Sequence, residues 1–204
     1  RYLLDPGEEN MAPKTLIQQG MDLIATPYLI ENVPLWITVN TFPKLSDGTP
    51  VNIYGRCFAQ APLEAIDAGC KVFEGDVKDN IMAIAAPSFE KGEYSYGDIE
   101  LILKTLISAF SQAKDLAPGK KCVVHGGNWG CGAFGGNLEL MYFAQLYAAS
   151  VCGIDELVLH AVEDDDAYEE AEWKFEYLDE EMSLDSVVNY LMSQGYEWGK
   201  SDGN

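Results

Sequence analysis

The sequence predicts an α/β fold in which helices cover the faces of a mixed, largely parallel sheet. Short apolar runs alternate with helix-length segments between residues 80 and 162. Such alternation is typical of parallel or mixed sheets, because each helix carries the chain back to start the next strand. A hydrophobic content of 48% in 204 residues is enough for one domain with a sizeable core. After residue 162 the composition becomes strongly acidic, which predicts a helical extension.

Local patterns divide the first half of the chain into short elements. Apolar spacing distinguishes helix from strand, and clusters of Gly, Pro, Asn, Asp and Ser indicate turns. The predicted elements are a helix over 15–30, a strand over 34–40, turn residues over 42–50, a strand over 51–59 and a short helix over 62–69. Pro27 would disturb the first helix, and Gly69 is placed to end the last.

The second half shows longer and more regular patterns. The predicted elements are a buried strand over 80–87, a helix over 94–116, a strand over 121–126, a glycine-rich loop, a helix over 137–153 and a strand over 155–162. The acidic segment 163–182 is predicted to be a solvated helix docked by Trp173, Phe175 or Tyr177. The alternative is an acidic segment that binds a protein partner. A final amphipathic helix follows, with Ser183 as its N-cap.

Charge and composition exclude several classes of protein. The formal net charge of −20 disfavours a broad surface for DNA or RNA, which needs Lys and Arg to neutralise phosphates. No apolar run reaches the length of a membrane span, and no signal peptide is visible. Five cysteines without close spacing and two histidines indicate neither a disulfide framework nor a metal site, and we expect no cofactor. We expect reduced thiols and a cytoplasmic or nuclear location.

The stretch VVHGGNWGCGAFGGN, residues 123–137, concentrates glycines between a predicted strand and a predicted helix. Glycine lets the backbone approach a ligand, and the N-terminus of a helix offers unpaired N–H groups to an anion. The loop lacks the GK[ST] ending of a Walker A motif. It matches GxGxxG over residues 130–135, but it comes late in the chain for a dinucleotide fold. A tight glycine turn without a ligand is the alternative.

The run GGNWGCGAFGGN, residues 126–137, resembles the second phosphate-binding loop of poly(ADP-ribose) glycohydrolases, which are macrodomains. Asn137 stands where the family has Asp. The resemblance implies a macrodomain-like three-layer α/β/α core over residues 1–162, with an acidic helical extension over 163–204 packed on it. Since the chain opens on Arg1, we expect the first strand or strands to lie upstream. The residues implied in binding the diphosphate and ribose of ADP-ribose are Gly127, Asn128, Trp129, Gly130, Cys131, Gly132, Ala133, Phe134, Gly135 and Gly136.

The resemblance also implies a pair of catalytic carboxylates. In the family a glycine triplet precedes Gln-Glu-Glu; this chain has Gly7 at the Gln position, followed by Glu8 and Glu9, and no triplet is visible. Glu9 would be the general acid/base at the ribose–ribose O-glycosidic bond of poly(ADP-ribose), with Glu8 as its neighbour. Without the resemblance, the two residues are a solvated acidic pair. The product would be ADP-ribose.

Two other functions stay open from the sequence. One is a non-catalytic macrodomain that binds ADP-ribose, and the other is a structural subunit that docks on a larger assembly through residues 163–182. Several residues receive plain structural interpretations. We expect His125 to be a packed or capping residue, His160 to be structural, and Tyr94 and Tyr96 to be surface or packing residues. Cys131 is expected to fill the loop rather than act as a nucleophile. The resemblance leaves Phe42 or Tyr54 to replace the family's aromatic clasp over adenine, and Val162 at the family's aromatic position.

Overall fold

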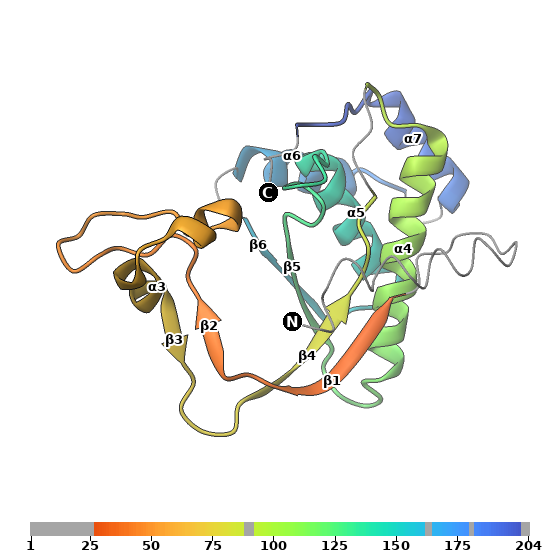
Figure 1. Ribbon diagram of the computed structural model, residues 1–204. Coiled ribbons are helices and arrows are strands. Elements are labelled where there is room, and N and C mark those ends of the chain that lie inside the picture. Colours follow the sequence, from red (N-terminus) through yellow and green to blue (C-terminus); the bar gives the residue numbers. More distant parts are fainter. Residues whose placement is uncertain (1–26, 88–91, 162–164, 180–181, 201–204) are drawn as a thin grey trace, which may run out of the picture. The chain divides into compact units, whose positions relative to one another are not determined.

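The computed structural model describes residues 27–87, 92–161, 165–179 and 182–200 (Figure 1). Contacts divide the chain into two compact units, which we call the small unit (Ile30–Ile81) and the large unit (chiefly Met82–Gly203). Among the described residues, no helix combines the length and the apolar character that a membrane crossing requires.

The small unit is built from short strands and helices. Its elements are β1 (Tyr28–Pro34), β2 (Ile37–Val39), the 3-10 helix η2 (Gly55–Gln60), α3 (Leu63–Gly69), β3 (Cys70–Val72) and β4 (Lys78–Ala83). Strands β2 and β3 pair antiparallel, and β1 pairs with β4. Gly69 ends α3 where no side chain fits, because a Cβ there would lie 2.7 Å from Ile53 Cδ1 and 2.8 Å from the Asn40 carbonyl oxygen.

Three sequence predictions need correction in this part of the chain. The helix over 15–30 is wrong at its end, because Tyr28 already begins β1, and residues 15–26 lie outside the described residues. The strand over 51–59 is wrong: Gly55, at φ +54°, redirects the backbone into η2. The strand over 80–87 exists as β4, but most of its residues are exposed or half-buried and only Ala83 is buried.

The large unit contains the long helices. Its elements are α4 (Tyr96–Asp115), β5 (Val123–Gly127), α5 (Leu138–Val151), β6 (Glu156–His160), α6 (Asp165–Glu176) and α7 (Leu184–Ser193). Strands β5 and β6 pair in parallel, from Val123 opposite Glu156 to Gly127 opposite His160. Helix α4 begins at a capping box, in which Ser95 and Asp98 satisfy each other's backbone N–H groups.

Helix α5 forms the centre of the large unit, and α4 and α6 both pack against it (Figure 1). Six consecutive residues, Leu140 to Gln145, are buried, so the helix is covered on all sides at its N-terminal end. The acidic helix α6 docks through Phe175, whose ring meets Phe143 edge-on at 6.2 Å. Trp173 and Tyr177 remain exposed and contact each other. The predicted N-cap of α7 is confirmed, because the Ser183 hydroxyl accepts from Ser186 N–H.

The described strands form two-stranded sheets, of which β5–β6 is parallel as predicted. The fold is therefore mixed α/β. A continuous three-layer arrangement and a domain boundary at residue 162 stay predictions.

An ion pair fastens α6 to the start of α5. Lys174 Nζ lies 2.5 Å from Glu139 Oε1, and both side chains are largely buried, at 14% and 22% exposure. The Tyr196 hydroxyl donates to the same carboxylate oxygen at 2.5 Å. Burial is the largest single influence on the pKa of Lys174 and lowers it, but the hydrogen bonds and charges of Glu139 and Glu170 together raise this pKa above its ordinary value of 10.5.

Replacing Lys174 by Met is expected to lower the free energy of unfolding by about 1–3 kcal/mol, because Glu139 loses its cation in a poorly solvated place. Since folding raises the pKa of Lys174, this stabilisation is present below pH 10.5 and is lost as the pH rises further. The control is Lys104→Met, which breaks an exposed pair with Glu100 and should cost about 0.5 kcal/mol or less. Denaturant unfolding checks both; equal effects would contradict the special role of Lys174.

Candidate ligand site at the glycine loop

The glycine loop, residues 126–137, leaves the end of β5 and enters α5. Its backbone is closed by its own hydrogen bonds. These run from Trp129 N to Gly127 O (2.7 Å), Cys131 N to Asn128 O (3.0 Å), Gly135 N to Gly132 O (3.0 Å) and Gly136 N to Gly130 O (2.8 Å). The loop therefore has a defined shape set by its own backbone.

Two glycines are required by this shape. Gly130 has φ +75°, and a Cβ on it would lie 3.0 Å from Ala86 Cβ. A Cβ on Gly136 would lie 2.8 Å from the carbonyl oxygen of Gly130, which is the acceptor of its own hydrogen bond. Because that neighbour is backbone, it cannot rotate away. The dense glycine run thus serves close backbone packing inside the loop.

The base of the loop is fixed by Gln145, a buried residue of α5 that sequence reasoning missed. Its Nε2 donates to Gly127 O at 2.9 Å, and its Oε1 accepts from Gly127 N–H at 3.3 Å. Gly126 leaves the room for this amide, since a Cβ there would lie 2.3 Å from Gln145 Oε1. Gln145 stands among apolar and small residues in its helix, and a buried polar residue needs partners. This isolated polar residue in an apolar helix is the sequence feature that could have indicated a structural role for Gln145.

Polar side chains fix the first half of the loop. Asn128, which is exposed, accepts a short hydrogen bond on Oδ1 from the Tyr142 hydroxyl. The half-buried indole of Trp129 donates to Ile84 O at 3.5 Å. Asn128 is thereby held by α5, while Trp129 is held by the segment that follows β4.

The tip of the loop offers backbone donors. The N–H groups of Gly132, Ala133 and Phe134 donate no hydrogen bond to any described residue. The Phe134 side chain is 44% exposed. Just beyond, Asn137 caps α5 by accepting from Leu140 N–H at 3.1 Å. Free N–H groups beside the positive end of a helix form a site suited to an anion.

Cys131 lies inside the loop and is not a nucleophile by its surroundings. Burial raises the pKa of its thiol to about 12, so the thiol stays protonated near neutrality. The Sγ donates to Trp129 O at 3.5 Å. These contacts support the interpretation of Cys131 as a residue that fills the loop.

The remaining residues that the sequence analysis named as candidates do not belong to the glycine loop. Glu8, Glu9 and Val162 lie outside the described residues. Phe42 and Tyr54 are exposed residues of the small unit, and their role over an adenine stays a prediction.

The two histidines, interpreted from the sequence as structural residues, contact each other at the surface. Both are exposed on neighbouring strands, with His125 Nδ1 lying 3.0 Å from His160 Nε2. Their ring centroids are 5.3 Å apart and the ring planes differ by 18°, so the rings lie edge to edge and share one hydrogen bond.

The predicted packing of Tyr94 is confirmed: it is buried, and its hydroxyl accepts from the N–H of Asn137 at 2.9 Å. Tyr96 instead donates to Asp185 at 2.5 Å, at the start of α7.

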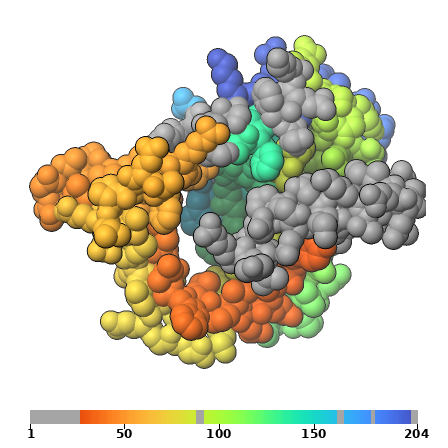
Figure 2. Space-filling view, in the orientation of Figure 1, coloured from red at the N-terminus to blue at the C-terminus, as the bar shows by residue number. Residues whose placement is uncertain are grey.

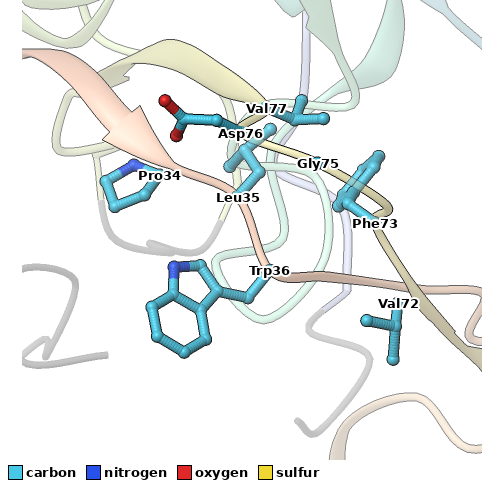
Figure 3. Close-up of a pocket in the computed structure, with 8 residues that line it drawn as sticks. All are labelled: Pro34, Leu35, Trp36, Val72, Phe73, Gly75, Asp76 and Val77. Carbon is cyan, nitrogen blue, oxygen red and sulfur yellow. The ribbon is translucent and has the colours of Figure 1, made fainter.

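A separate hollow of about 430 Å³ lies in the small unit (Figure 3). The segments 34–36 and 72–77 line it, and they lie side by side as red-orange and yellow atoms (Figure 2). Backbone bonds from Leu35 N to Val77 O and from Phe73 N to Trp36 O, both 2.9 Å, join these segments. Its walls are mostly apolar, and none of the residues implicated by the sequence lines it. We therefore place the candidate site at the glycine loop.

Comparison with known proteins gives the same family that the sequence of the glycine loop resembles. Residues 54–169 match the catalytic C-terminal region of the family described as poly(ADP-ribose) glycohydrolase (PARG), with the macro domain fold. The match spans more than half of the chain and contains the whole glycine loop. The chain belongs to the poly(ADP-ribose) glycohydrolase family. In a search of curated proteins, none matched the chain.

Proposed function

We propose that the chain hydrolyses the ribose–ribose O-glycosidic bonds of poly(ADP-ribose) and releases ADP-ribose. The observation that carries the proposal is the closed glycine loop, whose tip has backbone N–H groups that donate to no described residue and precedes the N-terminus of α5. Family membership supports the choice of ligand. Residues 127–136 hold the diphosphate and its ribose, and Glu9 is the general acid/base with Glu8 beside it.

The net charge of −20 repels anions at long range, so a bound anion has to be held by groups close to it. Backbone N–H groups are donors of this kind. The N–H groups of Gly132, Ala133 and Phe134 bind the phosphate oxygens without any Lys or Arg. Asn137 caps α5 with a neutral side chain, so no carboxylate at this position opposes the diphosphate. Glu139, in the first turn of α5, is already paired with Lys174.

The chemistry requires one carboxyl group that changes its protonation state. Glu9 donates its proton to the leaving ribose oxygen as the bond from that oxygen to the anomeric carbon breaks. The resulting carboxylate takes a proton from the water that attacks the anomeric carbon, which regenerates the acid. The diphosphate held by the loop stabilises the positive charge that develops on the ribose. No metal and no redox cofactor takes part in this scheme.

A calorimetric titration with ADP-ribose, with AMP as the control, tests the binding half of the proposal. We expect micromolar affinity for ADP-ribose and much weaker affinity for AMP, which lacks the diphosphate. Release of ADP-ribose from poly(ADP-ribose) tests the catalytic half. Binding without release would identify an ADP-ribose-binding macrodomain, and equal affinity for the two ligands would contradict a diphosphate site at the loop.

A further inference from the structure

A short C-terminal segment, which we call the strap (residues 195–199), follows α7 and lies against the residues that precede α4. Glu197 forms an antiparallel bridge with Glu93. Tyr94 N donates to Tyr196 O at 3.0 Å, and Trp198 N donates to Gly92 O at 2.9 Å. The strap is thus held by backbone pairing, independent of side-chain identity.

The strap also contacts the glycine loop directly. Gly199 N donates to Gly135 O at 2.8 Å, and Asn137 Nδ2 donates to Glu197 O at 3.4 Å. A Cβ on Gly199 would lie 3.2 Å from the Gly135 carbonyl oxygen and 3.4 Å from that of Gly136. The backbone of the strap therefore approaches the loop so closely that glycine fits best at this position.

A second connection runs through an aromatic stack. Trp198 lies on Tyr94 with ring centroids 4.0 Å apart and planes 17° apart, and both residues are buried. The Tyr94 hydroxyl in turn accepts the hydrogen bond from Asn137 N–H at 2.9 Å. Trp198 therefore fixes the ring of Tyr94, and Tyr94 in turn fixes Asn137, the residue that precedes α5.

Burying the indole of Trp198 costs free energy, because its N–H group loses its hydrogen bond to water. Its Nε1–H is buried and has no acceptor among the described residues. Buried donors in native proteins nearly always have partners, so the position of this ring is set by something other than its own hydrogen bonding. The stack on Tyr94 supplies that reason.

We propose that the strap is a positioning element for the ADP-ribose site: Trp198 and Gly199 fix the Gly135–Asn137 backbone in its ligand-binding conformation. This inference rests on the proposed function. The strap lies outside residues 54–169, so the matched region of the family does not contain it. Trp198 and Gly199 act through the loop and touch no reacting atom, so they are positioning residues.

The first test replaces Trp198 in the full chain. Trp198→Ala is expected to weaken ADP-ribose binding about tenfold and to speed hydrogen exchange at the amides of Gly136 and Asn137. Trp198→Phe keeps an aromatic ring on Tyr94 and should restore most of both. The control is Trp173→Ala, which removes an exposed tryptophan from its contact with Tyr177 in α6 and should change neither.

The second test uses a smaller change in case Trp198→Ala fails to fold. Gly199→Ala introduces one methyl group against the Gly135 and Gly136 carbonyls and is expected to weaken ADP-ribose binding about fivefold. The control is Gly97→Ala in the first turn of α4, where the nearest atom to the new Cβ is Ser95 Oγ at 3.8 Å. That variant should bind as the unaltered chain does.

Three outcomes separate the two proposals. Weaker binding and faster loop exchange in both strap variants, but not in the controls, support the positioning role. Unchanged affinity and unchanged exchange overturn it. If the unaltered chain fails to bind ADP-ribose, the proposed function falls, and the exchange of the Gly136 and Asn137 amides still decides whether the strap orders the loop.

Discussion

Replacing Glu9 by Gln is expected to lower the hydrolysis of poly(ADP-ribose) by about 10²–10⁴-fold, the usual contribution of a general acid/base. Gln has nearly the same shape as protonated Glu, but it cannot release a proton to the leaving oxygen or accept one from water. ADP-ribose binding should remain within about twofold, because the proposed diphosphate contacts come from backbone groups of the glycine loop and not from Glu9. Turnover assays and calorimetry on the same preparation measure the two effects.

The matched control for this variant is Glu169→Gln, which removes the same charge from an exposed position of α6. It should change neither turnover nor affinity. A Glu9→Gln protein that keeps full turnover would remove Glu9 from the catalytic assignment. A variant that loses ADP-ribose binding as well would show that Glu9 supports the ligand rather than the chemistry.

Replacing Gly136 by Ala is expected to abolish most ADP-ribose binding, with a loss of about 100-fold or more. The added Cβ would lie 2.8 Å from Gly130 O and 3.1 Å from Met141 Cε, so the loop must shift where it turns into α5. The shift would disturb the bond from Gly136 N to Gly130 O and move the tip donors away from the proposed phosphate positions. The free energy of unfolding should fall by about 1–3 kcal/mol, as for other overpacked interiors.

Calorimetry and denaturant unfolding measure these two quantities for Gly136→Ala. Gly97→Ala is again the control, because it adds the same methyl group on α4 with only an ordinary contact, to Ser95 Oγ at 3.8 Å. Full affinity together with full stability in Gly136→Ala would contradict the close backbone packing described for the loop.

The helices of the large unit could be predicted because their sequences carry complete local signals. Helix α4 combines 3.6-residue spacing with a capping box at Ser95, and α7 begins at Ser183 as its pattern indicates. The small unit was predicted less well. Gly55 adopts a positive φ, and the chain there forms η2 in place of the predicted strand. The apolar content of a segment does not predict the backbone conformation of one glycine.

The glycine loop could be predicted because its residues are consecutive in the sequence. The residues that hold it could not, because they come from elsewhere in the chain. Tyr94 is 43 residues from Asn137, and the strap comes later still, beyond α7. Contacts of this kind arise only when packing brings α4, α5 and the strap together, and no local pattern predicts them.

The clamp between Gln145 and Gly127 has a consequence for the order of folding. It spans only 18 residues, so closing it costs little chain entropy, whereas the contact between Gly199 and Gly135 must enclose a much longer stretch. We expect the base of the loop to form early, together with α5, and its tip to become fixed only when the strap packs against it. On a ribosome, the tip would then stay unformed until the strap has emerged from the exit tunnel.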